Sequence, residues 1–456
     1  MNGQPIDWGG VGRQLARLAD VARPARLLSV TLPLPFLPDV DVPGMGDWFV
    51  WRRPDRQQRL CGIGKAFTVT TAGAGRFAVL HAAHGGLLAD WRHAQAGAVP
   101  PPLACLGFAF APRGGGPLPN AALWVPELLL REEHGSAWAT FSCAASDVDA
   151  APARWQALWQ SLAAAPAVDA MPRLEPCRHP LAERAFLARG RAAVRAIDSG
   201  ALDKLVLTRS IRLRGEKPLA VAPILDALAA QHANCATFGV GRAGRAFIGA
   251  SPETLLRLDG ARVEVDALAG TAWRADAIAA PGTASPLSLG ADKNRREHDF
   301  VARAVAQALA AQCHDVAVPA APEVLQLDAL EHLRRRVVAT RRADVSALDL
   351  IARLHPTPAV GGTPSAATLD WLAHHGDRRG AWYTGGIGWL DAAGNAEVAV
   401  ALRCGLLYGR EATLFAGAGF VAGSDPAQEL AETEAKFSVM RAALAAGAVS
   451  TRQQAA

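Results

Sequence analysis

The pattern of hydrophobic and polar positions changes near residue 170. Before that point the chain is rich in proline and glycine and contains short hydrophobic runs such as "FAVLHAA" and "LACLGFAFAP", which are typical of strands. From Ala151 the pattern indicates a helix and then an alanine- and proline-rich link that ends near Asp169. We therefore divide the chain into a variable N-terminal part (1–170), a more regular part (171–447) and a tail (448–456) that we expect to be disordered.

After residue 170 the hydrophobic positions follow helical and strand periods. Helical spacing occurs in "LAERAFLARGRAAVRAIDSG", which ends at Gly200, from Lys293 to Cys313, and from Ala347 to Leu354. The segment "DKLVLTRSIRLRG" alternates like a strand. Its alternation places Lys204, Val206 and Thr208 on one face.

Two longer segments predict groups of strands. "RAFIGASPETLLRLDGARVEVDALAGTAWR" predicts a strand, a turn, a second strand, a tight Asp259-Gly260 turn and a third strand. The residues from Tyr383 to Val421 predict an antiparallel meander with short connections. Because the strands occur in groups, with helices between the groups, the pattern favours an α+β fold over a doubly wound parallel sheet.

The last predicted helix begins after Ser424 or Asp425, with Pro426 in its first turn. Its spacing puts four residues on one face: Glu429, Glu432, Lys436 and Met440. This face is either a solvated acidic stripe with an i,i+4 ion pair, or a functional surface that continues into the apolar side of the helix.

Three further ionisable residues occur where packing alone would not favour them. Glu297 lies one turn before Val301 on the apolar face of its helix, where it either meets solvent or binds a hard divalent cation. Lys204 either extends to solvent, pairs, or is desolvated and acts as a base with a lowered pKa. Glu253 in "GASPE" is either a turn acid or a carboxylic acid that an apolar pocket keeps neutral and ready to donate a proton.

The glycine-rich segments "LAGT", "GGIG" and "AGAG" lack the spacing of nucleotide-binding loops. We expect them to allow close backbone approach, with N–H groups offered to an anionic ligand such as a carboxylate.

Composition and net charge indicate the class of protein and limit its partners. The chain of 456 residues is 50% hydrophobic and 20% charged, which is typical of a globular protein with a large core. Its net charge of +5 is spread along the chain. The densest basic cluster, Arg334–Arg336 with Arg341 and Arg342, has no interleaved aromatics, so we interpret it as a solvated helix end or loop, with nucleic-acid binding as the alternative.

Cysteine usage and hydropathy point to a cytoplasmic protein. The seven cysteines are dispersed without a CxxC pair, which favours reduced thiols over a disulfide framework or a zinc site. The N-terminus lacks the hydrophobic region of a signal peptide, and no stretch approaches ~20 apolar residues. We therefore expect no membrane segment.

Taken in order, the motifs of residues 180–445 resemble those of the chorismate-utilising enzymes, which include isochorismate, salicylate, anthranilate and aminodeoxychorismate synthases. The matching segments are "KLVLTR" (204–209), "GASPE" (249–253), "LAGT" (268–271), "KNRREHDFV" (293–301), "HPTPAVGG" (355–362), "YTGGIGW" (383–389), "ALRC" (401–404), "AGAGFV" (416–421) and "SDPAQELAETEAK" (424–436). Each segment is weakly specific by itself, but the ordered series is specific.

The resemblance implies one large α+β domain with two packed antiparallel sheets surrounded by helices. It implies chorismate as substrate and Mg²⁺ as cofactor, held by Glu297 and Glu432 with Glu429 close by. The implied substrate-binding residues are Gly270, Thr271, His355, Tyr383, Arg403, Gly417 and Lys436. We expect no amidotransferase subunit and a monomer or weak homodimer.

The resemblance also separates branches of the family. Members that add water at C2 carry a lysine at the position of Lys204, which would act as the base, with Glu253 as the acid. Ala269 occupies the place of the nucleophilic lysine of aminodeoxychorismate synthases, which argues against amination. The apolar residue Val360 resembles the residue that isochorismate synthases carry at this position, so isochorismate formation is the leading prediction. A salicylate synthase and a non-catalytic binding relative remain the alternatives.

Overall fold

The computed structural model describes residues 6–20, 25–38, 40, 46–95, 99–114, 116–162, 174–177, 180–273, 292–327 and 330–446. The predicted tail 448–456 and most of the link after the helix that begins at Ala151 lie outside these residues. No helix within the described ranges is long and apolar enough to cross a membrane.

The N-terminal part contains α1 (Trp8–Ala19), β1 (Leu27–Leu34), β2 (Trp48–Arg53), β3 (Gln58–Ile63), β4 (Phe67–Thr71), α2 (Arg76–Asp90), β5 (Trp91–Gln95), β6 (Leu103–Phe108), β7 (Ala121–Val125), β8 (Leu128–Glu133), β9 (Ser136–Ala144) and α3 (Ala151–Ser161). The central part contains β10 (Leu174–Cys177), α4 (Pro180–Asp198), β11 (Lys204–Gly215), α5 (Val221–Gln231), β12 (Ala236–Arg242), β13 (Arg245–Ser251), β14 (Thr254–Asp259), β15 (Arg262–Trp273) and α6 (Asp292–Ala310). The C-terminal part contains β16 (Cys313–Ala317), β17 (Glu323–Leu327), β18 (Leu330–Arg341), α7 (Ala347–Leu354), β19 (Gly362–Thr363), α8 (Ser365–His374), β20 (Gly386–Asp391), β21 (Ala396–Val400), β22 (Cys404–Tyr408), β23 (Glu411–Val421) and α9 (Pro426–Ala446).

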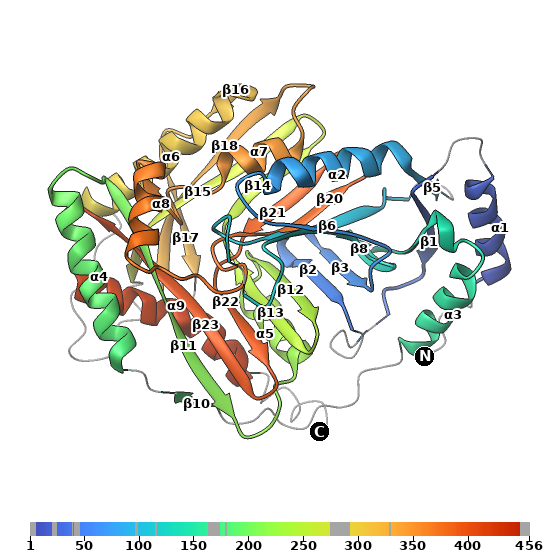
Figure 1. Ribbon diagram of the computed structural model, residues 1–456, viewed down its shortest axis with the longest axis horizontal. Helices are drawn as coiled ribbons and strands as arrows, with labels where there is room; N and C mark the ends of the chain where they lie inside the picture. The colour runs from blue at the N-terminus through green and yellow to red at the C-terminus, as the bar shows by residue number, and fades with distance from the viewer. Residues whose placement is uncertain are drawn as a thin grey trace.

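Within the described residues the strands form two sheets of 13 and 10 strands. All their pairings are antiparallel except that of β1 with β5. Helices lie outside the sheets: α4 and α9 run beside β11 and β23, and α2 and α7 pack together over the smaller sheet (Figure 1). The predicted α+β architecture of two packed sheets surrounded by helices is confirmed.

Strands of the N-terminal part lie in both sheets. In the larger sheet β2 pairs with β12, and in the smaller sheet β6 pairs with β20. Apolar side chains from the two sheets meet in a common core, as Phe49 of β2 and Trp124 of β7 do in an edge-to-face contact of 5.8 Å between ring centroids. The two parts of the chain therefore share sheets and core.

The chain crosses between the sheets at two neighbouring places. It passes from β13 in the larger sheet to β14 in the smaller one through Pro252 and Glu253, and back from β21 to β22 through residues 401–403. The two crossings are joined by backbone hydrogen bonds, from Val400 N to Glu253 O (3.1 Å) and from Ala250 N to Arg403 O (3.2 Å). This pairing fixes Glu253 and Arg403 side by side between the sheets.

The crossing at Arg403 corrects one prediction. The segment from Tyr383 to Val421 is not one meander but two hairpins, β20–β21 and β22–β23, in different sheets. Alternation of polar and apolar residues reports that a segment is extended, but it does not report which sheet the segment joins. Arg403 has a left-handed backbone with φ of +47°, an uncommon conformation for a side chain-bearing residue, at the point where the chain changes sheets.

Three other local predictions are wrong. The run "FAVLHAA" lies in α2, whose buried positions recur at helical spacing, because a short apolar run does not distinguish helix from strand. The helix predicted to reach Cys313 ends at Ala310, and Cys313 begins β16. The arginines 334–336 lie on strand β18, not at a helix end or in a loop, and each pairs with a carboxylate: Glu323, Asp299 and Asp266 respectively. Ion pairing on a strand explains the arginine cluster without a nucleic-acid partner.

Candidate active site

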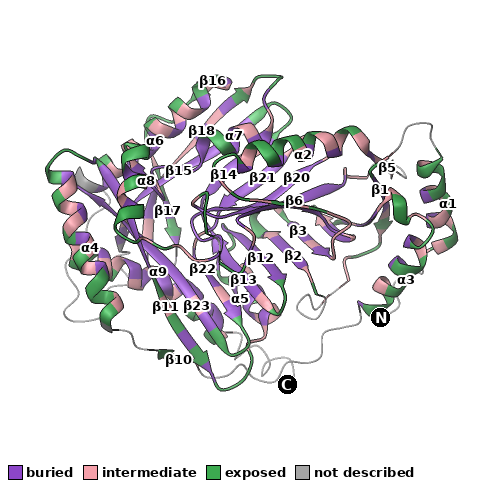
Figure 2. Ribbon diagram, viewed as in Figure 1, coloured by how far each residue is buried: buried purple, intermediate pink, exposed green. Residues whose placement is uncertain are grey.

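Eight of the twelve predicted site residues line a cavity between the two sheets, whereas Lys204, His355, Glu429 and Glu432 are not among its lining residues in the described part of the chain. The cavity is lined by Val206 of β11, Glu253 at the first crossing, Leu268–Thr271 of β15, Glu297 of α6, His332 of β18, Ala359 and Val360, Tyr383 and Thr384, Leu402 and Arg403 at the second crossing, Gly417 and Gly419 of β23, and Lys436 of α9. The half of β11 that contains Val206 is buried from Lys204 to Arg209, whereas residues 210–215 include both exposed and buried positions (Figure 2).

Lys204 lies at the start of β11, with none of its surface exposed. Its Nζ is 3.1 Å from Glu297 Oε1, and Glu297 is part of the cavity wall. Glycine is required opposite this pair, because a Cβ at Gly419 would lie 2.2 Å from Glu297 Oε1. The register that pairs Val206 with Gly419 therefore brings a desolvated amine and a carboxylate together at the cavity.

Glu253 is buried at the first crossing. Its backbone N–H donates to Ser251 Oγ at 3.2 Å, which shapes the turn that follows β13. Burial, and then the neighbouring charge of Asp266, raise the pKa of the Glu253 carboxyl to about 8, although Lys204, Arg403 and Lys436 act in the opposite direction. The group is therefore mostly protonated at neutral pH and able to donate a proton.

This raised pKa predicts a pH-dependent effect of Glu253→Gln on stability. Between the ordinary pKa of an unfolded glutamate, ~4.3, and the folded value, the folded protein holds a proton that the unfolded chain has released. The free energy of unfolding then falls as pH rises, by at most ~1.4 kcal/mol per pH unit. Glutamine removes this penalty, so the thermal midpoint of Glu253→Gln, relative to the unsubstituted protein, should be higher at about pH 8.5 than at about pH 5. Equal differences at both pH values would contradict a neutral buried Glu253.

Lys436 brings a cationic group to the cavity from α9. Its Nζ donates to the carbonyl of Gly417 at 3.0 Å and pairs with Glu432 Oε1 at 2.5 Å. Glu432 also acts electrostatically on Arg403, so the two cationic residues and this carboxylate lie in one region. Glu429, one turn earlier on α9, is buried, but the described residues that line the cavity do not include it.

His332 is a site residue that the sequence interpretation missed. Its Nε2 lies 2.9 Å from Arg403 Nη2, and its Nδ1 lies 3.2 Å from Thr271 Oγ1. Because a guanidinium only donates, Nε2 accepts and the ring proton is on Nδ1. Burial, with the charge of Arg403, holds the pKa of His332 well below its usual range, so the ring is neutral. Only the pairing of β15 with β18, which sets Thr271 opposite His332, identifies this residue.

Tyr383 and His355 occupy different positions. Tyr383 lines the cavity and stacks on Phe415 with ring centroids 5.4 Å apart, and burial raises the pKa of its hydroxyl.

His355 was predicted to line the pocket, but it is not among the cavity-lining residues of the described chain. It packs against Phe108, and its Nε2 lies 3.0 Å from the carbonyl of Thr384. His355 therefore contacts a residue of the cavity wall without lining the cavity itself. Burial lowers the pKa of His355 to about 3, which keeps it neutral.

Arg379 is a second residue that the sequence interpretation missed. Its guanidinium donates to the carbonyls of Val206 (3.0 Å) and Val360 (2.6 Å) and to the hydroxyl of Thr384 (2.9 Å). Asp377 accepts from its Nε at 2.9 Å. Three separate cavity segments are thereby joined through one buried side chain.

The carboxylates fit a divalent cation shared with a substrate. Gly417 and Gly419 are two residues apart on one face of β23, a spacing of ~7 Å. Glu297 contacts Gly419, and the Lys436–Glu432 pair contacts Gly417, so α6 and α9 direct carboxylates to neighbouring points. The described residues contain no cluster of three or more His, Cys, Asp or Glu side chains that could hold a metal by themselves. Mg²⁺ commonly takes one or two carboxylates and completes its coordination with substrate oxygens and water.

Comparisons with known proteins identify the family of the chain. Residues 18–445 match the sequence model of a family described as "Chorismate binding enzyme". The chain is 34% identical to the "Salicylate biosynthesis isochorismate synthase" of Pseudomonas aeruginosa over 76% of this chain and 75% of that protein. It is 36% identical to "Isochorismate synthase MenF" of Bacillus subtilis over 53% of this chain, an alignment that spans 51% of that relative, about half its length.

Solved structures give the same picture. MenF, the menaquinone-specific isochorismate synthase from Escherichia coli, superimposes with a TM-score of 0.75 and 25% identity, covering 96% of this chain and 99% of that one. Anthranilate synthase component I from Streptococcus pneumoniae has a TM-score of 0.66 at 18% identity, covers 84% of this chain and 92% of that one, and shares the fold.

Proposed function

The chain belongs to the chorismate-binding enzymes, and from this membership we propose that it catalyses the Mg²⁺-dependent isomerisation of chorismate to isochorismate. The observation that carries the proposal is a buried carboxylic acid, Glu253, that lines a cavity between the two sheets, together with a buried amine, Lys204, whose Nζ lies 3.1 Å from the cavity-lining Glu297. Several relatives are named isochorismate synthases, which supports the same reaction.

In the proposed reaction Lys204 takes a proton from a water molecule that adds to C2 of chorismate. The ring double bonds shift, and Glu253 gives its proton to the departing C4 hydroxyl, which leaves as water. One group must accept a proton while the other releases one. The amine must therefore be neutral and the carboxylic acid protonated before the reaction, which requires a different environment around each group. The raised pKa of Glu253 meets this requirement on the acid side.

The cationic residues would hold the carboxylates of chorismate. Lys436 and Arg403 line the cavity, and His332 fixes the guanidinium of Arg403 by accepting one of its N–H groups. Gly270 and Gly417 line the cavity and would offer backbone groups to the substrate. A Cβ at Gly270 would lie 2.9 Å from the carbonyl oxygen of Asn294, so glycine at this position allows β15 to pack closely against α6. Glu297 and Glu432 would hold Mg²⁺, with Glu429 behind them, and the bound ion would supply positive charge to orient the ring carboxylate.

The deciding experiment is incubation of the purified protein with chorismate and Mg²⁺, followed by chromatographic and mass-spectrometric identification of products. We expect isochorismate in near-equilibrium with chorismate. Salicylate with stoichiometric pyruvate would assign the alternative salicylate synthase reaction. Absence of any turnover would reject the enzymatic proposal and favour a binding role.

Removal of the proposed metal ligands gives a separate prediction. Glu432→Ala and Glu297→Gln should each abolish Mg²⁺-dependent activity, because one carboxylate lost from so small a ligand set leaves the ion weakly held. Calorimetric titration of Mg²⁺ into each variant checks this without turnover. Glu434→Gln on the outer side of α9, where the carboxylate pairs with Arg209 and Arg441, is the matched control. An unchanged Mg²⁺ titration in Glu432→Ala would remove that residue from the site.

A further inference from the structure

A second, larger cavity lies on the other side of Glu253. It has a volume of about 470 Å³ and is lined by Arg53, Asp55, Asn234, Ala236, Ser251–Thr254, Asp266, Val324–Gln326, Arg334 and Arg336. Among the described residues, Glu253 is the one residue that lines both this cavity and the substrate cavity. The proposed acid thus forms a partition between the two spaces.

The walls of the second cavity suit water better than an ionic ligand. Each of its arginines is already paired: Arg53 with Asp55 at 2.8 Å, Arg334 with Glu323 at 2.6 Å and Arg336 with Asp266 at 3.3 Å. Because each described arginine of the lining already has a carboxylate partner, an anion would have to compete with these ion pairs, whereas water would not. At ~30 Å³ per liquid water molecule, the space accommodates on the order of ten waters.

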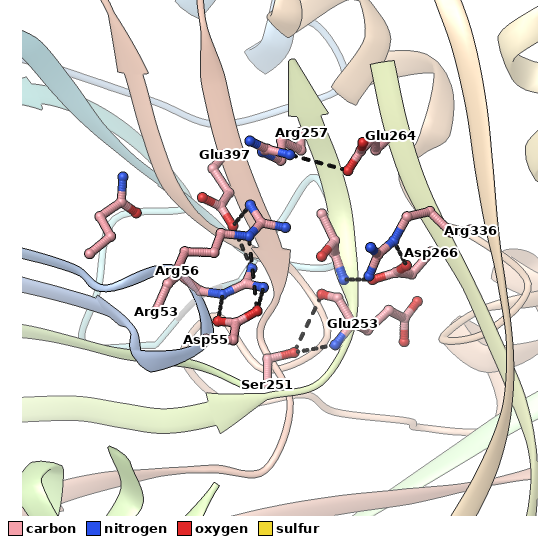
Figure 3. A network of polar contacts seen from close by, with 12 residues as sticks. Arg53, Asp55, Arg56, Ser251, Glu253, Arg257, Glu264, Asp266, Arg336 and Glu397 are labelled. Atoms are coloured by element: carbon pink, nitrogen blue, oxygen red, sulfur yellow. Dashed lines mark hydrogen bonds and ion pairs between the residues drawn. The ribbon is translucent and has the colours of Figure 1, made fainter. Parts of the chain in front are cut away.

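Glu253 lines this space next to the Asp266–Arg336 pair. Ser251 holds its backbone, and the carboxyl group extends away from the Arg53–Asp55 pair, beneath the Asp266–Arg336 pair (Figure 3). Among the residues that the structure describes, its buried Oε1 has no hydrogen-bond partner. Asp266 also accepts from the backbone N–H of Thr254 at 3.1 Å, so its carboxylate is fixed next to the acid.

We propose that the second cavity is the route by which Glu253 recovers its proton from solvent, with Asp266 as the residue that positions and tunes it. This inference rests on the proposed function. Each turnover leaves Glu253 as a carboxylate and Lys204 as an ammonium group. A water chain in the second cavity delivers one proton to Glu253, and Lys204 returns one proton to water through the substrate cavity, so the cycle releases no net proton. The protonated form of Glu253 is thus restored through the second cavity, and the neutral form of Lys204 through the substrate cavity.

Infrared difference spectroscopy on the full chain, without substrate, tests the route. The carbonyl stretch of a protonated carboxylic acid is assigned to Glu253 by its loss in Glu253→Gln, and its shift after transfer into D₂O reports proton exchange. Thr254→Leu adds apolar volume to the wall of the second cavity next to Glu253, whereas Ala359→Leu adds volume to the wall of the substrate cavity and serves as the matched control.

We expect exchange at least ~10-fold slower in Thr254→Leu and unchanged in Ala359→Leu, because exchange in Thr254→Leu then depends on the narrower substrate cavity of about 60 Å³ or on local opening of the fold. Slower exchange in Ala359→Leu alone, equal slowing in both variants, or no slowing in either would overturn the proposal. Thermal unfolding of each variant verifies that it is folded.

Asp266→Asn provides a second test that preserves shape. The charged groups that face Glu253 are Lys204 on β11, Arg403 at the second crossing, Lys436 on α9 and Asp266 on β15, and Asp266 alone among them favours the protonated acid. Replacement of the Asp266 carboxylate by a neutral amide should lower the pH at which the infrared band of protonated Glu253 disappears. An unchanged titration of this band would show that Asp266 does not affect the protonation of Glu253. If the protein turns over no chorismate, the proposed function is wrong. The measurement of proton exchange at Glu253 still shows whether the second cavity connects this residue to solvent.

Discussion

Glu253→Gln is expected to lower kcat for isochorismate formation by at least ~10²-fold, the usual contribution of a positioned general acid. Glutamine keeps the shape of the side chain but cannot protonate the departing C4 hydroxyl. In the unsubstituted enzyme, kcat/KM should fall as pH rises through about 8, where Glu253 loses its proton. The residual activity of the variant should lack this descending limb.

Glu264→Gln is the matched control for this variant. Glu264 lies on β15, the strand that carries Gly270, but it pairs with Arg262 at 2.9 Å and does not line the cavity. We expect its kcat to stay close to that of the unsubstituted enzyme. Near-normal turnover by Glu253→Gln, or an unchanged descending limb, would remove Glu253 from the acid role.

Lys204→Met is expected to cause a second loss of at least ~10²-fold in kcat, because no other group then accepts the proton of the attacking water. Methionine approximates the length and apolar stem of lysine, so the buried site stays filled. The substitution also removes the 3.1 Å contact between Lys204 Nζ and Glu297 Oε1, so a lower thermal midpoint is expected. Steady-state kinetics and thermal unfolding must therefore be measured together.

The control for Lys204→Met is Lys217→Met, at an exposed position beyond β11. It should change neither kcat nor the thermal midpoint appreciably. If Lys204→Met is folded at the assay temperature and still forms isochorismate at a normal rate, another group supplies the base.

Several features followed from the sequence because they depend on neighbours along the chain. Alternation placed Lys204 and Val206 on one strand face, and Val206 lines the cavity with Lys204 paired beside it. The cap and proline at the start of α9 fixed the phase of that helix, and with it the direction of Lys436. The ordered motifs indicated the family and the two-sheet α+β fold.

Other features depend on contacts between distant segments, which local periodicity does not encode. The hydrogen-bonded crossings set Glu253 beside Arg403, and strand pairing set His332 opposite Thr271. Arg379 gains its role from three carbonyl and hydroxyl groups on separate segments.

The sequence by itself determined which residues could carry acid–base and metal chemistry, because side-chain type and helix or strand phase are local properties. Only the tertiary structure decided which of them share a cavity, that His355 stands behind the wall, and that Glu253 divides two cavities. The physical reason is that desolvation and charge at a site come from strands far apart in the chain, as Asp266 and burial between the sheets do for Glu253.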